Sequence, residues 1–170
     1  MWRNDVADVL ARYCRAVDRC DWELLRTVYH PDAVIDHGAY QGDVAGFVAF
    51  VQSRRVGIVH SAHYLSNVLV EQLDDERAAS ESYGWAVQSF TSASPLVPAG
   101  SAGIRQRSTY RYVDLFEQRA GRWAIAEAHL VLGDVQTELL DEEPWRRDGL
   151  SQRPGTDDPL YGLLRRWTTR

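Results

Sequence analysis

The chain contains no lysine: its 19 basic residues are all arginine. Chemistry that needs a lysine amine, such as Schiff-base formation, is therefore excluded. Cysteine is also scarce, and the two present, Cys14 and Cys20, form neither a disulfide framework nor a metal-binding spacing. The net charge of -5 argues against a general role on nucleic acids or on a membrane surface.

No stretch approaches ~18 consecutive apolar residues, and the opening MWRNDVADVL holds no apolar signal core. These absences lead us to expect a cytoplasmic protein without a membrane partner. Glycine-rich phosphate loops, Gly-x-Ser-x-Gly and Cys-x-x-Cys are missing too, so nucleotide binding and serine hydrolysis have no support. Of the 170 residues, 45% are hydrophobic and 25% are charged, a composition typical of globular proteins. A chain of this length can form one domain with a sizeable core.

Helical spacing dominates the first third of the chain. Val6, Val9 and Leu10 begin one apolar face, behind a cap at Asn4 or Asp5. The pattern predicts a first helix through Val17, a second over 21–29, a short strand over 33–37 and a third helix over 43–54 that Asp43 caps. His30-Pro31 ends the second helix, because proline disfavours a helical conformation in the residue before it.

From residue 60 the period of the hydrophobic pattern changes to two. Strands are predicted over 60–73, 77–91, 105–118 and 122–137, with turns or loops between them. Helices followed by a run of long strands predict an α+β fold, in which helices close one face of a curved antiparallel sheet.

Residues 138–170 differ from the domain predicted over 1–137. They combine prolines with large apolar side chains, namely Pro144, Pro154, Pro159, Trp145, Leu160, Tyr161, Leu163, Leu164 and Trp167. A solvated tail seldom carries so many large apolar groups. We therefore expect this C-terminal extension to pack on the domain or on a neighbouring subunit, with a disordered tail as the alternative.

Two polar side chains interrupt an apolar strand face in VHSAHYLSNVLVEQL. Alternation places His63 and Asn67 on the same face as Leu65 and Leu69. Burying such groups without partners costs a few kcal/mol. His63 is therefore either a hydrogen-bonded structural histidine or a functional one.

A family resemblance covers roughly residues 4–137. The stretch VDRCDWELLRTVYHPDAVIDHGAYQG, followed by HYLSN, ERAASESYGWAV and GRWAI, resembles the SnoaL-like group of the nuclear-transport-factor-two-like superfamily. The chain is most similar to the branch that holds scytalone dehydratase, the bile acid 7α-dehydratases and hexachlorocyclohexane dehydrochlorinase. The resemblance implies a cone-shaped α+β barrel, with three N-terminal helices against a strongly curved, mixed and mainly antiparallel sheet that encloses an apolar cavity.

The same resemblance implies a catalytic pair. In that branch an aspartate after the first helix pairs with a histidine on the strand after the third helix, and the matching residues here are Asp18 and His63. The histidine would project into the cavity and act as general acid and base, while the carboxylate orients it, without metal or cofactor. The alternative for Asp18 is a solvated residue that begins a turn.

Five further residues are candidates for substrate binding: Tyr13, Asn67, Gln88, His129 and His37. Tyr13 could instead be a core aromatic. His37 and Gln88 stand where the scytalone enzyme has a tyrosine and a second histidine, which argues against scytalone as the substrate. His129 could line the cavity mouth or pair with Glu127 at a subunit contact.

A metal site formed from His30, Asp32, Asp36, His37 and His60 has suitable residue types but no tight ligand spacing, so none is expected. The leading hypothesis is a cofactor-independent lyase that dehydrates a hydrophobic cyclic molecule such as a polyketide, steroid or aromatic metabolite. Alternatives are an isomerase or cyclase with the same pair, a non-catalytic binding module, or a small subunit of a dioxygenase. A homo-oligomer, dimer or trimer, is expected because a curved sheet needs its outer face covered.

Overall fold

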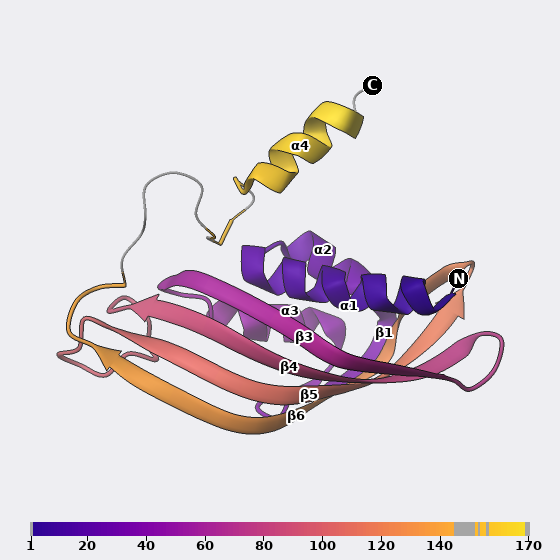
Figure 1. Cartoon of the computed structure of the whole chain (residues 1–170), viewed down its shortest axis with the longest axis horizontal. Helices are drawn as coiled ribbons and strands as arrows, with labels where there is room; N and C mark the ends of the chain where they lie inside the picture. The colour runs from indigo at the N-terminus through magenta and orange to yellow at the C-terminus, as the bar shows by residue number, and fades with distance from the viewer. Residues whose placement is uncertain (1, 145–151, 153, 156, 169–170) are drawn as a thin grey trace.

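The structure is a computed structural model that describes residues 2–144, 152, 154–155 and 157–168. Its elements in chain order are α1 (Trp2–Arg19), α2 (Trp22–Val28), β1 (Tyr29–Asp36), β2 (Gln41–Gly42), α3 (Val44–Ser53), β3 (Ile58–Gln72), β4 (Arg77–Thr91), β5 (Gly103–Arg119), β6 (Arg122–Leu140) and α4 (Pro159–Thr168). The long strands β3 to β6 curve beneath the layer formed by α1, α2 and α3 (Figure 1).

The strands form one sheet in the order β2-β1-β6-β5-β4-β3. Strand β1 runs parallel to β6, and the other neighbours are antiparallel. The predicted fold class, an α+β cone with a curved, mixed and mainly antiparallel sheet, is confirmed. The sheet is curled but not closed, since β2 and β3 stand at its two ends.

Aspartates fix where two of the helices begin. The Asp21 carboxylate accepts a hydrogen bond from the backbone N–H of Leu24 (3.0 Å), and Asp43 accepts one from Gly46 (2.8 Å). Each satisfies a backbone donor that the first helical turn leaves unpaired. The predicted cap at Asp43 is confirmed, and the helices predicted over 21–29 and 43–54 end within a residue of α2 and α3.

The predicted strand over 33–37 is too short, because β1 begins at Tyr29 and includes Pro31. The pairing with β6 shifts register between Tyr29 and Val34. Such an irregularity allows a residue without an N–H to sit inside a strand. Strand β6 also runs beyond the predicted end at 137, since Leu140 pairs with Gly103 on β5.

The core lies between the helices and the concave face of the sheet. Val6, Val9 and Leu10 of α1 are buried there, as the helical spacing predicts. Phe47 of α3 is fully buried, and its ring meets that of Tyr29 edge-on at 5.9 Å. The helical layer and the sheet therefore share one continuous apolar core.

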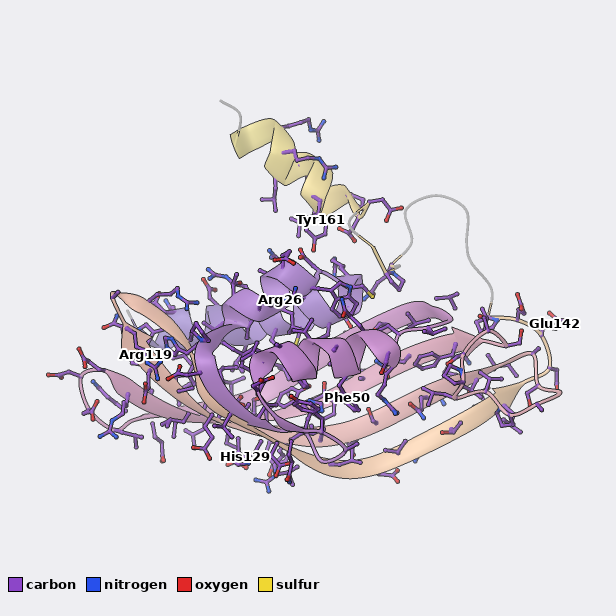
Figure 2. All side chains as sticks on the ribbon, turned by 180° about the vertical axis from the view of Figure 1, so that it is seen from behind. Arg26, Phe50, Arg119, His129, Glu142 and Tyr161 are labelled. Atoms are coloured by element: carbon purple, nitrogen blue, oxygen red, sulfur yellow. The ribbon has the colours of Figure 1, made fainter. Side chains whose placement is uncertain are left out.

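The described parts of the C-terminal extension contact the end of α1 and the start of α2. The Gly155 N–H donates to the Arg19 carbonyl (2.9 Å), and Asp158 pairs with the Arg19 side chain (3.3 Å). The Tyr161 hydroxyl donates to Asp21 (2.8 Å), and Figure 2 shows Tyr161 at the base of α4, above the helical layer. Trp145 and the Trp167 side chain, which the sequence analysis includes, lie outside the described residues. Among the described helices, none is long and apolar enough to cross a membrane.

Gly84 on β4 makes room for the buried ring of Tyr110 on the neighbouring strand. A Cβ at this position would lie 2.2 Å from the Tyr110 Cε2 atom, far inside van der Waals contact. We expect Gly84→Ala to lower the free energy of unfolding by about 1–3 kcal/mol, measured by urea denaturation.

Gly162→Ala is the matched control, because a Cβ at Gly162 meets no atom within 4 Å among the described residues. Adding Tyr110→Ala to Gly84→Ala should remove the clash, so the two effects should be less than additive. Equal stability of Gly84→Ala and the wild type would contradict this account.

Candidate functional site

A cavity of about 300 Å³ opens between the helices and the concave face of the sheet. Its apolar walls include Val17, Phe50, Val51, Phe90, Leu96, Leu130 and Leu132. Its polar lining includes Tyr13, His37, Arg54, Arg55, His63, Gln88, Gln106, Ser108, Tyr110 and Tyr112. A hollow of this size, whose surface is more apolar than polar, suits a small hydrophobic molecule that also carries polar groups.

Asp18 and His63 are in direct contact at the wall of this cavity. Asp18 lies in the last turn of α1 and is only 5% exposed. Its Oδ1 atom is 2.5 Å from Nδ1 of His63, and its Oδ2 atom accepts the backbone N–H of His63 at 2.9 Å. The carboxylate thus holds both the ring and the backbone of the same residue on β3.

Hydrogen bonds determine the charge of Asp18 and the tautomer of His63. Burial raises the pKa of the Asp18 carboxyl, but the hydrogen bonds and charge of His63, with a further hydrogen bond from Ser61, outweigh burial and lower it overall. Whenever the His63 ring carries one proton, an ionised Asp18 holds that proton on Nδ1, which leaves the lone pair on Nε2. The second ring nitrogen can then take a proton from a ligand.

Two residues of this network were missed by the sequence analysis. The Ser61 hydroxyl donates to Asp18 Oδ1 (2.7 Å) and accepts from Nη1 of Arg55 (2.9 Å). Ser61 could have been found, because it lies two residues before His63 and so on the same strand face. No pattern signals Arg55, which follows α3 and reaches the cavity only through the tertiary fold.

Tyr13 and His37 meet at the cavity wall, and Tyr112 extends the cluster. The Tyr13 hydroxyl lies 3.3 Å from Nε2 of His37 and accepts from the Tyr112 hydroxyl at 3.5 Å. Burial lowers the pKa of His37 to about 4, so its ring is neutral at pH 7. Burial also raises the pKa of Tyr13, which keeps its proton. Both side chains line the cavity, as does Gln88 on β4.

Asn67 does not line the cavity, and the strict alternation predicted for its strand is wrong at this point. Its φ angle is +49°, and the β3–β4 register shifts between Ser66 and Leu69. This β-bulge adds one residue to β3 and reverses the phase of the side chains. Before it Leu65 packs against the core, and after it Val70 does, while Asn67 is exposed.

His129 lies outside the main cavity. Its Nε2 atom is 2.7 Å from Oε1 of Glu127, and both side chains are substantially exposed. Figure 2 shows His129 on the side of the sheet away from the helical layer. Of the two alternatives for His129, the structure has the pairing with Glu127, while a subunit contact at this pair stays a prediction.

The residues considered for a metal site are dispersed. His30 donates to the Glu117 carbonyl (2.9 Å), Asp32 pairs with Arg119 (2.5 Å), and His37 belongs to the cavity wall. Within the described part of the chain, no group of three or more histidine, cysteine, aspartate or glutamate side chains is placed to hold a metal ion.

Asp114 is a buried carboxyl that the sequence analysis also missed. It is 4% exposed and borders a small hollow of about 10 Å³ together with Tyr13, Tyr29 and Tyr112. Burial raises the pKa of Asp114 to about 8. The sequence signal is a polar residue that continues the inward alternation of Tyr110 and Tyr112 on β5.

The profile of a family described as "SnoaL-like domain" matches residues 2–129 of the chain. Among proteins with curated descriptions, none matches the sequence. The family match spans α1 through most of β6, and so includes every residue of the network around Asp18.

Several solved structures have the same fold. One is hexachlorocyclohexane dehydrochlorinase LinA type 2, with a TM-score of 0.69 and 13% identity over 86% of this chain and 94% of that one. A proposed scytalone dehydratase from Novosphingobium aromaticivorans has a TM-score of 0.68 and 13% identity over 86% and 95%. The Kfla4162 protein from Kribbella flavida has a TM-score of 0.67 and 16% identity over 79% and 92%. At these identities the likeness establishes the fold.

The raised pKa of Asp114 has a consequence for stability. In the unfolded chain this carboxyl ionises near pH 4, whereas in the folded protein it stays protonated until about pH 8. Asp114 therefore lowers the free energy of unfolding progressively as the pH rises from 4 to 8, by about 1 kcal/mol per pH unit. Asp114→Asn should lack this decrease of the free energy of unfolding with pH. Its stability relative to the wild type should therefore increase from pH 5 to pH 8.

Urea denaturation at pH 5, 6, 7 and 8 measures the difference. The lowered pKa of His37 acts in the opposite direction below about pH 6.5, but His37 is present in both proteins and its effect largely cancels. Asp8→Asn, at an exposed position on α1, is the control. A stability difference that stays constant with pH would refute the assignment of a protonated Asp114.

Proposed function

The chain belongs to the SnoaL-like domain family, and on that premise we propose that it is a cofactor-independent lyase. It eliminates water, or a comparable leaving group, from a hydrophobic cyclic small molecule. The observation that carries the proposal is the contact of 2.5 Å between Asp18 and His63 at the wall of a largely apolar cavity.

The reaction needs one proton taken and one proton returned. Nε2 of His63 removes a proton from a carbon beside an electron-withdrawing group, and the electron pair of that C–H bond forms the new double bond. The neighbouring C–O bond breaks, and the imidazolium gives its proton to the departing hydroxyl, so that water leaves and His63 returns to its neutral state. General acid–base catalysis of this kind contributes roughly 10²–10⁴-fold.

Asp18 stabilises the positive charge that His63 carries between the two transfers. Its carboxylate accepts the Nδ1 proton and keeps the ring oriented, as in other carboxylate–histidine pairs. The attraction is stronger than in water, since Asp18 is buried and the cavity walls are largely apolar. Tyr13 and Gln88 line the same cavity and can donate hydrogen bonds to a ligand oxygen.

The activities named for two structural relatives agree with an elimination. One is a dehydrochlorinase and the other a proposed dehydratase, and both reactions remove a leaving group and a proton from neighbouring carbons. An isomerase or cyclase would begin with the same proton abstraction, so the product identifies the reaction.

His63→Ala and Asp18→Asn should each reduce turnover by at least about 100-fold, because the first removes the base and the second its orienting charge. The assay mixes purified protein with a panel of hydroxylated cyclic ketones and follows the conjugated product by absorbance. His60→Ala on β3 is the control, since alternation places His60 on the face opposite His63.

Circular dichroism establishes that each variant is folded. Full turnover by folded His63→Ala would end the lyase proposal. Ligand binding without turnover across the panel would favour a binding module, and stable co-purification with a large catalytic subunit would favour a small-subunit role.

We further propose that the protein is a homo-oligomer that covers the outer face of its sheet. Tyr64, Tyr83, Trp85, Val113 and Val131 are all exposed and occupy neighbouring register positions on β3 to β6. The rings of Tyr64 and Trp85 stack at 4.6 Å, and Arg111 pairs with Glu81 beside them. Exposed apolar side chains that gather around an ion pair in this way are typical of protein–protein contacts.

Trp85→Glu should shift the protein towards monomer, because it places a charge in the centre of this apolar face. Sedimentation velocity over a range of concentrations measures the change. Leu73→Glu is the control, since Leu73 is equally exposed but lies at the turn beyond β3. A monomeric wild type, or an oligomer unaffected by Trp85→Glu, would contradict this interface.

A further inference from the structure

We propose that Arg55 is the subsite that binds a carboxylate on the hydrophobic ligand of the cavity. This proposal concerns the same cavity as the function proposed above, because Arg55 and His63 both line it. It therefore rests on that function for the assignment of the cavity as the ligand site. It narrows the ligand class to hydrophobic cyclic acids.

The fold brings the Arg55 side chain into the wall of the cavity. Arg55 follows the end of α3, where its backbone N–H donates to the Gln52 carbonyl (3.1 Å). Its neighbour Arg54 also borders the cavity but is exposed, with its guanidinium 5.8 Å from the centre of the Phe50 ring. Of these two cations, Arg55 is the one whose guanidinium joins the buried network.

A hydroxyl group separates the charge of Arg55 from that of Asp18. Ser61 accepts from Nη1 of Arg55 (2.9 Å) and donates to Oδ1 of Asp18 (2.7 Å). Among the residues that the structure describes, Ser61 is the one hydrogen-bond partner of this guanidinium, and no carboxylate forms a direct ion pair with it. The cation therefore lacks a contact counterion inside a poorly solvated wall.

The carboxylate of Asp18 already accepts hydrogen bonds from other donors. It receives the His63 ring, the His63 backbone N–H and the Ser61 hydroxyl. Burial lowers the pKa of Arg55, yet an arginine keeps its charge at neutral pH. An anionic ligand group would supply the contact that the guanidinium lacks.

The chemistry of arginine selects a carboxylate in particular. A guanidinium presents five N–H donors in a planar fork, and that fork matches the two oxygens of a carboxylate. The hydrogen bond to Ser61 comes from Nη1, and among the described residues the Nε and Nη2 atoms have no hydrogen-bond partner. Gln88 and the neutral His37, which line the same cavity, have no positive charge with which to hold an anion, and the guanidinium of Arg54 is exposed.

Binding at Arg55 would also orient the ligand for the reaction. Arg55 and His63 are joined through two intervening side chains, Ser61 and Asp18, so the anion site stays at a fixed place relative to the ring. A carboxylate held there would leave the hydrophobic ring system of the ligand against the apolar walls and His63.

Two isosteric probes, 2-naphthoate and 2-naphthamide, test the proposal by isothermal titration calorimetry. They share size and shape and differ in charge. The wild type should bind 2-naphthoate more tightly by roughly 10–100-fold, the range of a charge-assisted hydrogen bond. Arg55→Met should lose this preference while binding 2-naphthamide as before, and Arg55→Lys should retain part of it.

Arg12→Met is the control, because it removes the same charge from an exposed position on α1 and should keep the preference. A wild type that binds 2-naphthoate no better than 2-naphthamide, whether both bind or neither does, overturns the proposal and needs no variant to fold. An unchanged preference in Arg55→Met or Arg55→Lys overturns it as well.

These measurements involve no turnover, so the two proposals can fail separately. If Arg55→Met loses the preference for 2-naphthoate and the wild type turns over no substrate, the lyase proposal is contradicted and the anion site is supported. If the wild type shows turnover that depends on His63 but no preference for 2-naphthoate, the anion site is contradicted and the lyase proposal is supported.

Discussion

The buried carboxylate of Asp18 is the constraint on which the site depends. It lies at the end of α1, and its partners His63 and Ser61 lie on β3. A buried carboxylate without hydrogen bonds would be strongly unfavourable, so helix and strand must meet with these donors in place. The same contacts fasten the helical layer to the sheet and set the direction of the imidazole ring. The stability of the fold and the proposed chemistry therefore depend on one set of hydrogen bonds.

The curvature of the sheet provides the space that this ring faces. Four long strands bend beneath three helices (Figure 1), and the side chains of the concave face fill only part of the enclosed volume. The buried polar groups in and around this space differ in charge state: Asp18, behind His63, is ionised, while His37 at the cavity wall and Asp114 at the smaller hollow are held neutral by burial. The interior thus contains an anion whose hydrogen bonds are already made (Asp18), a cation (Arg55) and neutral donors. Such an arrangement can distinguish ligands by their charge.

Local physics made much of the fold predictable. Helical spacing, the Asp43 cap and strand alternation predicted the α+β class and the order of the elements from α1 to β6 except β2, because each depends on residues close in sequence, whereas β2 and α4 were not predicted. The pairing of Asp18 with His63 came from a family resemblance and not from their spacing. Arg55 could not be predicted, since its place in the cavity depends on its hydrogen bond to Ser61 and on distant elements that meet around the cavity. Asn67 was misplaced because alternation assumes a regular strand, and asparagine tolerates the positive φ that a bulge requires.

That bulge separates two parts of the same hairpin. Between His60 and Ser66 the strand keeps one continuous register with β4, and His63 is held within this segment. Beyond Asn67 the ladder resumes with its phase reversed, up to the turn at residues 73–77. A shift of strand register or a change of loop length in the outer segment can be accommodated at the bulge, where the extra residue already interrupts the ladder. Along β3, the distal turn of the hairpin is thus separated from the imidazole by an interrupted ladder, and we expect an insertion at this turn to leave the direction of the ring unchanged.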